Sequence, residues 1–177
     1  MSQSWLSDRI LAAGRWKSLR FVKRHPLACA AVVAGFIRLA LASRGLPTLD
    51  RFFVPDDTYY TLSIARSLAD GLGPVASSGV TTNGFQPLWA FLLVPFAVVF
   101  DGQADALLRT AIIGGALFGT VNVWLLGKLA ADSVGEATGG WAAWLWALSP
   151  VAIENALCGL ETALALTCAL ALCSTFN

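Results

Sequence analysis

The fold is decided by one apolar stretch, Pro87-Leu88-Trp89-Ala90-Phe91-Leu92-Leu93-Val94-Pro95-Phe96-Ala97-Val98-Val99-Phe100. If this stretch crosses a membrane, every later loop lies on the opposite side. As a helix, its roughly 14 residues reach only about 21 Å, less than the roughly 30 Å hydrocarbon core of a bilayer. Pro95 also falls inside it, and proline removes a hydrogen bond from a helix interior. We therefore predict a re-entrant or interfacial helix over residues 87–100 that stays on the outer side.

The composition of the whole chain is that of a membrane protein. Hydrophobic residues make up 56% of the 177 residues, charged residues only 13%, and the mean hydropathy is +0.67. A water-soluble domain carries far more charge, so we predict an integral membrane protein. The four cysteines show no metal-binding spacing, which favours small buried thiols. Nucleic-acid binding is not expected, because the basic residues near the N-terminus match no recognised module.

The N-terminal region fixes the expected orientation. Residues 1–25 are basic, with apolar residues at helical spacing, and we predict an amphipathic helix on the cytoplasmic leaflet. Residues 26–43 form the expected first span, in which Arg38 lies near the far end and is expected to snorkel outward. A secretory signal peptide cleaved near residues 40–42 is the alternative. Both interpretations place residue 44 and those that follow outside the cytoplasm.

The remaining apolar runs complete an all-α membrane fold. We predict about four transmembrane helices, a cytoplasmic amphipathic helix and an outer loop with interfacial helices. The expected segments are a first outer loop over 44–105, a second span over 106–131, a cytoplasmic turn over 132–138, a third span over 139–153, a second outer loop over 154–161 and a fourth span over 160–176. If residues 87–100 crossed as well, the second outer loop would instead face the cytoplasm.

An acidic pair, Asp56-Asp57, lies in the first outer loop. Two adjacent carboxylates at a membrane surface can act as general base and metal ligand, because a divalent cation relieves their mutual repulsion. The alternative is capping of a helix that starts near Thr58, which requires only one of them. We predict a short helix on the membrane surface, with Tyr60, Ile64 and Leu68 in one stripe at helical spacing, that ends at Gly71.

The predicted topology brings further acids to the same side. Eight acidic residues are expected on the outer face: Asp50, Asp56, Asp57, Asp70, Asp101, Asp105, Glu154 and Glu161. Carboxylates from two separate loops can therefore converge. For Glu154 and Glu161, a solvated charge in a loop or first helical turn is the alternative interpretation.

Four segments in this order resemble one enzyme family. They are Pro55-Asp56-Asp57-Thr58-Tyr59-Tyr60, Ile64-Ala65-Arg66-Ser67-Leu68-Ala69-Asp70-Gly71-Leu72-Gly73, Thr82-Asn83-Gly84-Phe85-Gln86-Pro87-Leu88-Trp89 and Gly159-Leu160-Glu161-Thr162-Ala163-Leu164. Together they resemble the N-terminal part of GT-C type glycosyltransferases. These are polytopic enzymes that use polyprenyl-phosphate sugars, and the likeness is to bacterial mannosyl-, arabinosyl- and aminoarabinose-transferase-like members.

The resemblance implies an inverting sugar transfer on the outer side of a bacterial cytoplasmic membrane. Asp56 and Asp57 match the acidic motif of the first outer loop, and Glu161 matches the acid of the second. One first-loop carboxylate would deprotonate or orient the acceptor hydroxyl while the lipid phosphate leaves. The same three residues would hold a divalent metal, Mg²⁺ or Mn²⁺, in members that use one. The implied partners are a polyprenyl-phosphate sugar donor, the bilayer and an acceptor that the sequence does not identify.

Other polar residues are candidates for substrate binding. Asn83 and Gln86 can hydrogen-bond a sugar, with a turn at Asn83-Gly84 as the alternative. Arg66 can bind a phosphate, with a surface ion pair to Asp70 as the alternative. Trp89 is expected to anchor at the membrane interface.

The chain is much shorter than the enzymes it resembles. We therefore expect it to be the N-terminal portion of an enzyme and to be inactive alone. A small transporter or a membrane scaffold, in which the outer acids bind a cation or a partner, is the alternative function, and a nonfunctional remnant is a third. A transporter needs polar groups near the bilayer midplane. Asn122 is the one obvious candidate, and such a residue more often packs against a neighbouring helix.

Overall fold

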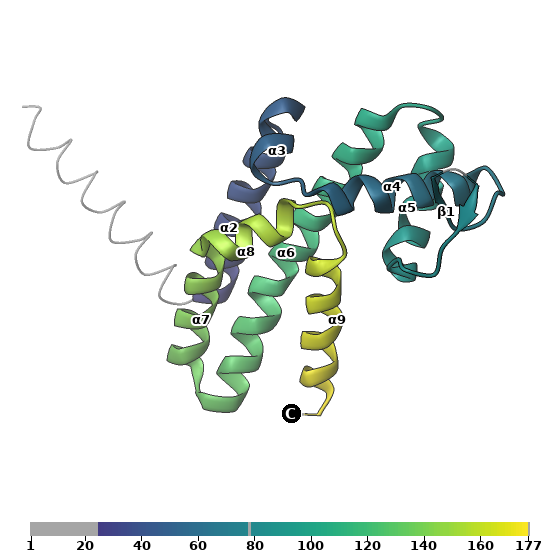
Figure 1. The fold of residues 1–177 in the computed structure, drawn as a ribbon. Coiled ribbons are helices and arrows are strands. Elements are labelled where there is room, and N and C mark those ends of the chain that lie inside the picture. The colour runs from purple at the N-terminus through teal and green to yellow at the C-terminus, as the bar shows by residue number, and fades with distance from the viewer. Residues whose placement is uncertain (1–24, 78, 177) are drawn as a thin grey trace, which may run out of the picture.

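The computed structural model describes residues 25–77 and 79–176, so the amphipathic helix predicted over residues 1–25 lies almost entirely outside the described residues. Within them the chain is mostly helical, with eight helices and one two-stranded antiparallel sheet (Figure 1). The elements are α2 (Pro26–Ala42), α3 (Leu46–Phe52), α4 (Asp56–Ala69), β1 (Val75–Ser77), β2 (Val80–Thr81), α5 (Pro87–Val99), α6 (Ala104–Val134), α7 (Glu136–Leu148), α8 (Pro150–Leu157) and α9 (Thr162–Thr175).

The helices form a bundle with a polar layer at one end. α6 packs against α2, α7 and α9, and α2 also packs against α7. α4 runs across one end of this bundle, and α5 and the β-hairpin lie against it (Figure 1). This end of the bundle contains the predicted acidic motif, at the start of α4, and the predicted second outer loop, which follows α8.

One to three helices are candidates to span a membrane, which indicates a membrane protein. α6 has 31 residues and is long and apolar enough alone. The pairs α2 with α3 and α8 with α9 qualify only if each is counted as one broken span, bent by 110° and 112°. α5 has 13 residues and is not among the candidates, so the predicted shortness of the apolar stretch is confirmed.

The boundaries of the predicted third span are wrong. A continuous helix was expected over residues 139–153, but α7 begins at Glu136 and ends at Leu148. The chain then bends at Ser149 and Pro150, where the Ser149 hydroxyl accepts a hydrogen bond from the Ala152 amide at 3.4 Å. Serine followed by proline favours the start of a helix, because the hydroxyl caps it and proline is pre-organised for its first position. Glu154 therefore lies on a separate helix, α8.

Small residues let the bundle helices approach closely. A Cβ atom at Gly119 would lie 2.5 Å from the Ala156 Cβ, and one at Gly127 would lie 2.9 Å from the Ala143 Cβ. Asn122 is on the same helix and is buried, with its amide donating to the Ala163 carbonyl at 2.9 Å. Small residues and single polar groups are the usual means of helix association in membranes. The expectation that Asn122 packs against a neighbouring helix is confirmed.

Arg38 does not snorkel outward as predicted. Its side chain is 0% exposed, and its guanidinium donates to the carbonyls of Ala147 at 3.3 Å and Trp146 at 3.5 Å. It also donates to the Ala34 carbonyl on its own helix. The end of α7 leaves carbonyls unpaired and carries a partial negative charge, which attracts a cation. This interior partner was not visible in the sequence, because α7 was expected to continue to residue 153.

We predict that Gly139→Ala destabilises the fold. A Cβ at this position would lie 2.5 Å from the Gly127 carbonyl oxygen and 2.6 Å from the Ala131 Cβ. Because backbone atoms block the added methyl group, α6 and α7 must separate, at a cost of about 1–3 kcal/mol. The measurement is the free energy of unfolding in detergent micelles. Thr138→Ala, one residue away and exposed, is the control and should change it by less than about 0.5 kcal/mol.

Candidate functional site

The acidic pair forms the first turn of α4. The helix begins at Asp56, with Pro55 at the N-cap, and both aspartates are exposed. Among the described residues neither carboxylate forms a side-chain hydrogen bond, so the alternative interpretation, capping of a helix that starts near Thr58, is not observed. Both side chains instead lie in the first turn of the helix, next to its positive dipole end. The two carboxylates are therefore presented to solvent from a rigid helix end.

α4 ends as predicted, and only part of the apolar stripe is buried. Asp70 follows its last residue, and Gly71 has a φ of +73°, the left-handed conformation that favours glycine. Ile64 of the predicted apolar stripe is buried, but Tyr60 remains 37% exposed. Its hydroxyl lies 2.9 Å from the Thr82 hydroxyl, so the phenol tip is held in a polar contact. The buried positions of this helix are Thr58, Thr61, Leu62, Ile64 and Ala65.

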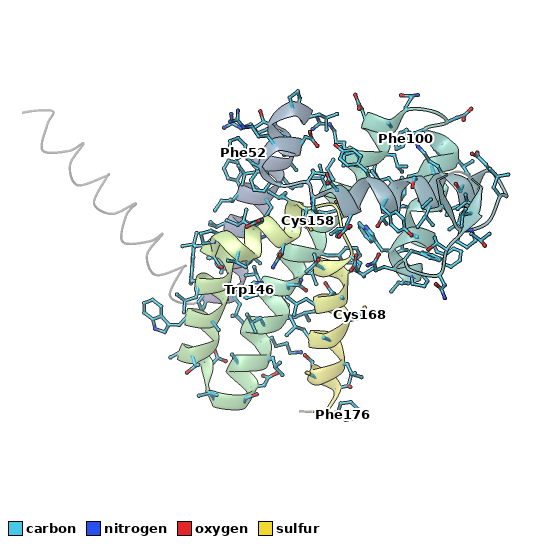
Figure 2. All side chains as sticks on the ribbon, in the orientation of Figure 1. Phe52, Phe100, Trp146, Cys158, Cys168 and Phe176 are labelled. Atoms are coloured by element: carbon cyan, nitrogen blue, oxygen red, sulfur yellow. The ribbon has the colours of Figure 1, made fainter. Side chains whose placement is uncertain are left out.

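The two predicted outer loops meet at the turn between α8 and α9. The Thr58 hydroxyl donates to the Cys158 carbonyl at 2.6 Å, and the Trp89 indole donates to the Gly159 carbonyl at 2.9 Å. Cys158 lies where α8 and α9 join, at the same end of the bundle as Phe52 (Figure 2). The residue directly after the acidic pair is thus bonded to the loop that precedes Glu161.

Gly159 is required for this close approach. Its φ is +77°, and a Cβ would lie 2.8 Å from the Thr58 Cγ2. Trp89 is 3% exposed and packs edge-on against Phe118, with ring centroids 6.2 Å apart. The expectation that Trp89 anchors at the membrane interface is therefore wrong. Its indole N–H finds its partner in a backbone carbonyl of the second loop, a contact that the sequence pattern did not reveal.

A cavity of about 350 Å³ lies between the two loops. Carboxylates from both loops reach it, Asp50 from α3 and Glu154 from α8. Its complete lining is Asp50, Arg51, Phe52, Phe53, Val54, Pro55, Glu154, Asn155, Cys158, Leu160 and Thr162. Asp50 and Glu154 were expected on the outer face, but nothing in their spacing indicated that they share a cavity. Asp56 and Glu161 directly adjoin lining residues in sequence and are not lining residues themselves.

Glu161 holds an unusual position just before α9. Its side chain is partly buried, and its Oε2 atom is buried without a hydrogen-bond partner in the described part of the chain. A buried carboxylate oxygen without a donor is costly, so this atom is available to a hydroxyl group or a water molecule.

No metal centre is formed by the described residues alone. Within residues 25–77 and 79–176, no group of three or more His, Cys, Asp or Glu side chains is arranged to hold a metal ion. The Mg²⁺ or Mn²⁺ expected at Asp56, Asp57 and Glu161 remains a prediction, and we assign no step of a reaction to it.

The predicted substrate-binding residues lie in two different places. Asn83 and Gln86 are exposed in the loop between β2 and α5. The turn there is closed by Thr82, whose hydroxyl accepts from the Gly84 amide at 3.1 Å. Arg66 lines a second cavity, of about 430 Å³, formed by α3, α4 and the start of α6. Among the described side chains it forms no ion pair with Asp70.

Asp50 lines both cavities and is held by a phenol. The Tyr59 hydroxyl donates to Asp50 Oδ1 at 2.5 Å. This hydrogen bond, together with a small loss of hydration and the charge of Asp50, raises the pKa of Tyr59 to about 12. The protonated phenol therefore persists to high pH and keeps the Asp50 carboxylate in one orientation.

Comparison of the chain with protein-family models, with curated proteins and with solved structures finds no match. Two loops far apart in the sequence are joined by hydrogen bonds, and carboxylates from both lie beside one cavity. Such a surface can bind hydroxyl groups and accept a proton from one of them.

We predict that Trp89→Phe loosens the contact between the two loops. The substitution keeps the ring but leaves the buried Gly159 carbonyl unpaired, at a cost of about 1–3 kcal/mol. Thermal unfolding in detergent measures the loss. Trp124→Phe serves as the control because Trp124 is 44% exposed on α6. Equal unfolding temperatures for the two variants would contradict the role of the indole hydrogen bond.

We also predict that Tyr59 ionises with a pKa of about 12. A Tyr60→Phe background leaves Tyr59 as the one tyrosine of the chain, so phenolate ultraviolet absorbance reports it alone. Asp50→Ala should return its pKa toward 10, and Asp70→Asn should not change it. Because the folded pKa is the higher one, stability from this bond is complete below pH 10 and is lost as pH rises toward 12. A pKa near 10 in the Tyr60→Phe background would contradict the bond.

Proposed function

We infer that the chain is the N-terminal portion of a membrane glycosyltransferase of the GT-C type. It would transfer a sugar from a polyprenyl-phosphate donor to an extracytoplasmic acceptor, with inversion at the anomeric carbon. The main support is the hydrogen bond from Thr58 to the Cys158 carbonyl, which joins the acidic motif to the loop before Glu161. The four sequence segments of the resemblance are thereby gathered at one end of the bundle.

The architecture is compatible with this assignment. In the proposed topology α2, α6, α7 and α9 cross the membrane, and α4 and α5 lie at its outer surface. α7 is as short as α5, but α7 packs along α6 within the bundle, whereas α5 packs mainly against α4. α4 runs across the bundle end rather than along it (Figure 1). An interfacial helix can hold an acidic motif where a lipid-borne phosphate and a water-soluble acceptor meet.

The proposed reaction uses one carboxylate of the acidic pair as general base. The acceptor hydroxyl gives its proton to Asp56 or Asp57 as its oxygen forms a bond to the anomeric carbon. The bond between that carbon and the phosphate oxygen breaks on the opposite face, and the phosphate leaves with the bonding electrons. The positive end of the α4 dipole stabilises negative charge at this position. The reaction needs no oxidant or reductant.

The positions of the remaining polar candidates suggest a different role for each. Glu161 presents a buried oxygen without a partner, which suits a sugar hydroxyl as donor. Asn83 and Gln86 are exposed beside α5 and are proposed to hydrogen-bond the sugar. Arg66 is ten positions beyond Asp56 on α4, about 15 Å along a helix. We therefore assign Arg66 no contact with the reacting phosphate.

We predict that Asp56→Asn or Asp57→Asn, whichever removes the base, and the double variant strongly lower sugar transfer without affecting membrane insertion. Loss of a general base lowers the rate by about 10²–10⁴-fold. The assay measures transfer of a labelled sugar from polyprenyl-phosphate donors, in membranes from cells that express the complete reading frame. Asp70→Asn is the matched control, since Asp70 is exposed at the other end of α4. Normal turnover in both single variants and the double variant would refute the proposed function.

A further inference from the structure

The larger cavity, of about 430 Å³, contains charges that the proposed reaction does not use. Asp50 from α3, Arg66 from α4 and Asp105 from α6 reach it, together with Tyr59 and Ser63. The apolar lining consists of Leu46, Pro47, Leu62, Ala104, Leu107 and Leu108. The cavity thus combines this apolar lining, which we call the leucine floor, with side chains of both charges. Its size is typical of a site for a small organic molecule.

The opposite charges in this cavity are not paired with each other. Among the described residues, neither the Arg66 guanidinium nor the Asp105 carboxylate forms a hydrogen bond or an ion pair with another side chain. Asp50 accepts one hydrogen bond, from Tyr59, and its second oxygen remains available. If Arg66 and Asp105 only served to neutralise one another, they would be in contact. Their separation within one cavity instead suits a ligand that carries a cation at one end and an anion at the other.

The cavity lies at one end of α6, a helix that is longer than the hydrocarbon core of a bilayer. Its 31 residues reach about 46 Å, roughly 16 Å more than the hydrocarbon core of a bilayer. The excess must extend beyond the core, and the cavity is lined by the first residues of this helix, Ala104 to Leu108. A ligand bound here can keep its polar part in the headgroup region and place apolar carbons against the leucine floor.

We propose that this cavity binds the headgroup of a zwitterionic phospholipid that has a primary ammonium group, phosphatidylethanolamine. The ammonium group donates to Asp50 and Asp105, and the phosphate accepts from Arg66. The glycerol and first acyl carbons contact the leucine floor. This binding is separate from the proposed sugar transfer and does not depend on it. A primary ammonium donates three hydrogen bonds, whereas the quaternary ammonium of phosphatidylcholine donates none.

Native mass spectrometry of the purified protein tests this proposal. The protein in detergent is given phosphatidylethanolamine, phosphatidylglycerol or phosphatidylcholine with identical acyl chains. We expect phosphatidylethanolamine to be retained most. Arg66→Gln should lower retention of all three lipids, because each of them carries the phosphate. Asp105→Asn should lower retention of phosphatidylethanolamine alone, by up to about fivefold for such an exposed charge.

Asp101→Asn is the matched control. Asp101 is an exposed carboxylate in the turn before α6 and does not line the cavity. Its substitution should therefore leave the retention of all three lipids unchanged. Circular dichroism establishes that each variant keeps its helices. Equal retention of the three lipids, or an Asp105→Asn effect that is the same for all of them, would overturn the proposal. Equally strong binding of soluble glycerophosphoethanolamine would also overturn it, because the leucine floor would then contribute nothing.

Discussion

The rest of the structure depends on two hydrogen bonds to one turn. Thr58 and Trp89 donate to the neighbouring carbonyls of Cys158 and Gly159, across separations of about 100 and 70 residues. Carbonyls at the end of a helix lack partners within that helix, and a buried unpaired carbonyl is costly. Donors from α4 and α5 meet that requirement here. The acidic pair, the apolar stretch and the second outer loop are thereby held at one end of the bundle.

A related constraint operates inside the bundle. α7 also ends with unpaired carbonyls, and the buried guanidinium of Arg38 donates to two of them. Breaking one apolar segment into α7 and α8 leaves unpaired backbone groups, which the bundle satisfies with a cation from α2. The break also turns α8 across the bundle end, so Glu154 lies beside the cavity between the loops. The irregular segment therefore positions polar side chains that a continuous helix would have directed elsewhere.

Local patterns in the sequence predicted several elements well. Gly71 ended the surface helix as expected, and the apolar stretch proved too short to count as a span. These predictions succeeded because glycine conformation and helix length are local properties. Predictions that depended on a partner elsewhere failed for Arg38 and Trp89, which are both buried. Such amphipathic side chains are stable at a membrane interface. Here each of the two instead donates a hydrogen bond to a carbonyl in the interior that would otherwise be unpaired.

The sequence by itself determined the class of the molecule, a mostly helical membrane protein. Apolar composition can be counted directly from the sequence, and helix length depends on consecutive residues. It also marked the acidic pair and the loop around Glu161 as candidates for chemistry. Only the tertiary structure decided which carboxylates share a cavity, since Asp50 and Glu154 are brought together by the bends after α2 and α7. Such bends depend on long-range hydrogen bonds and close packing, and these contacts join residues whose spacing in the sequence carries no pattern.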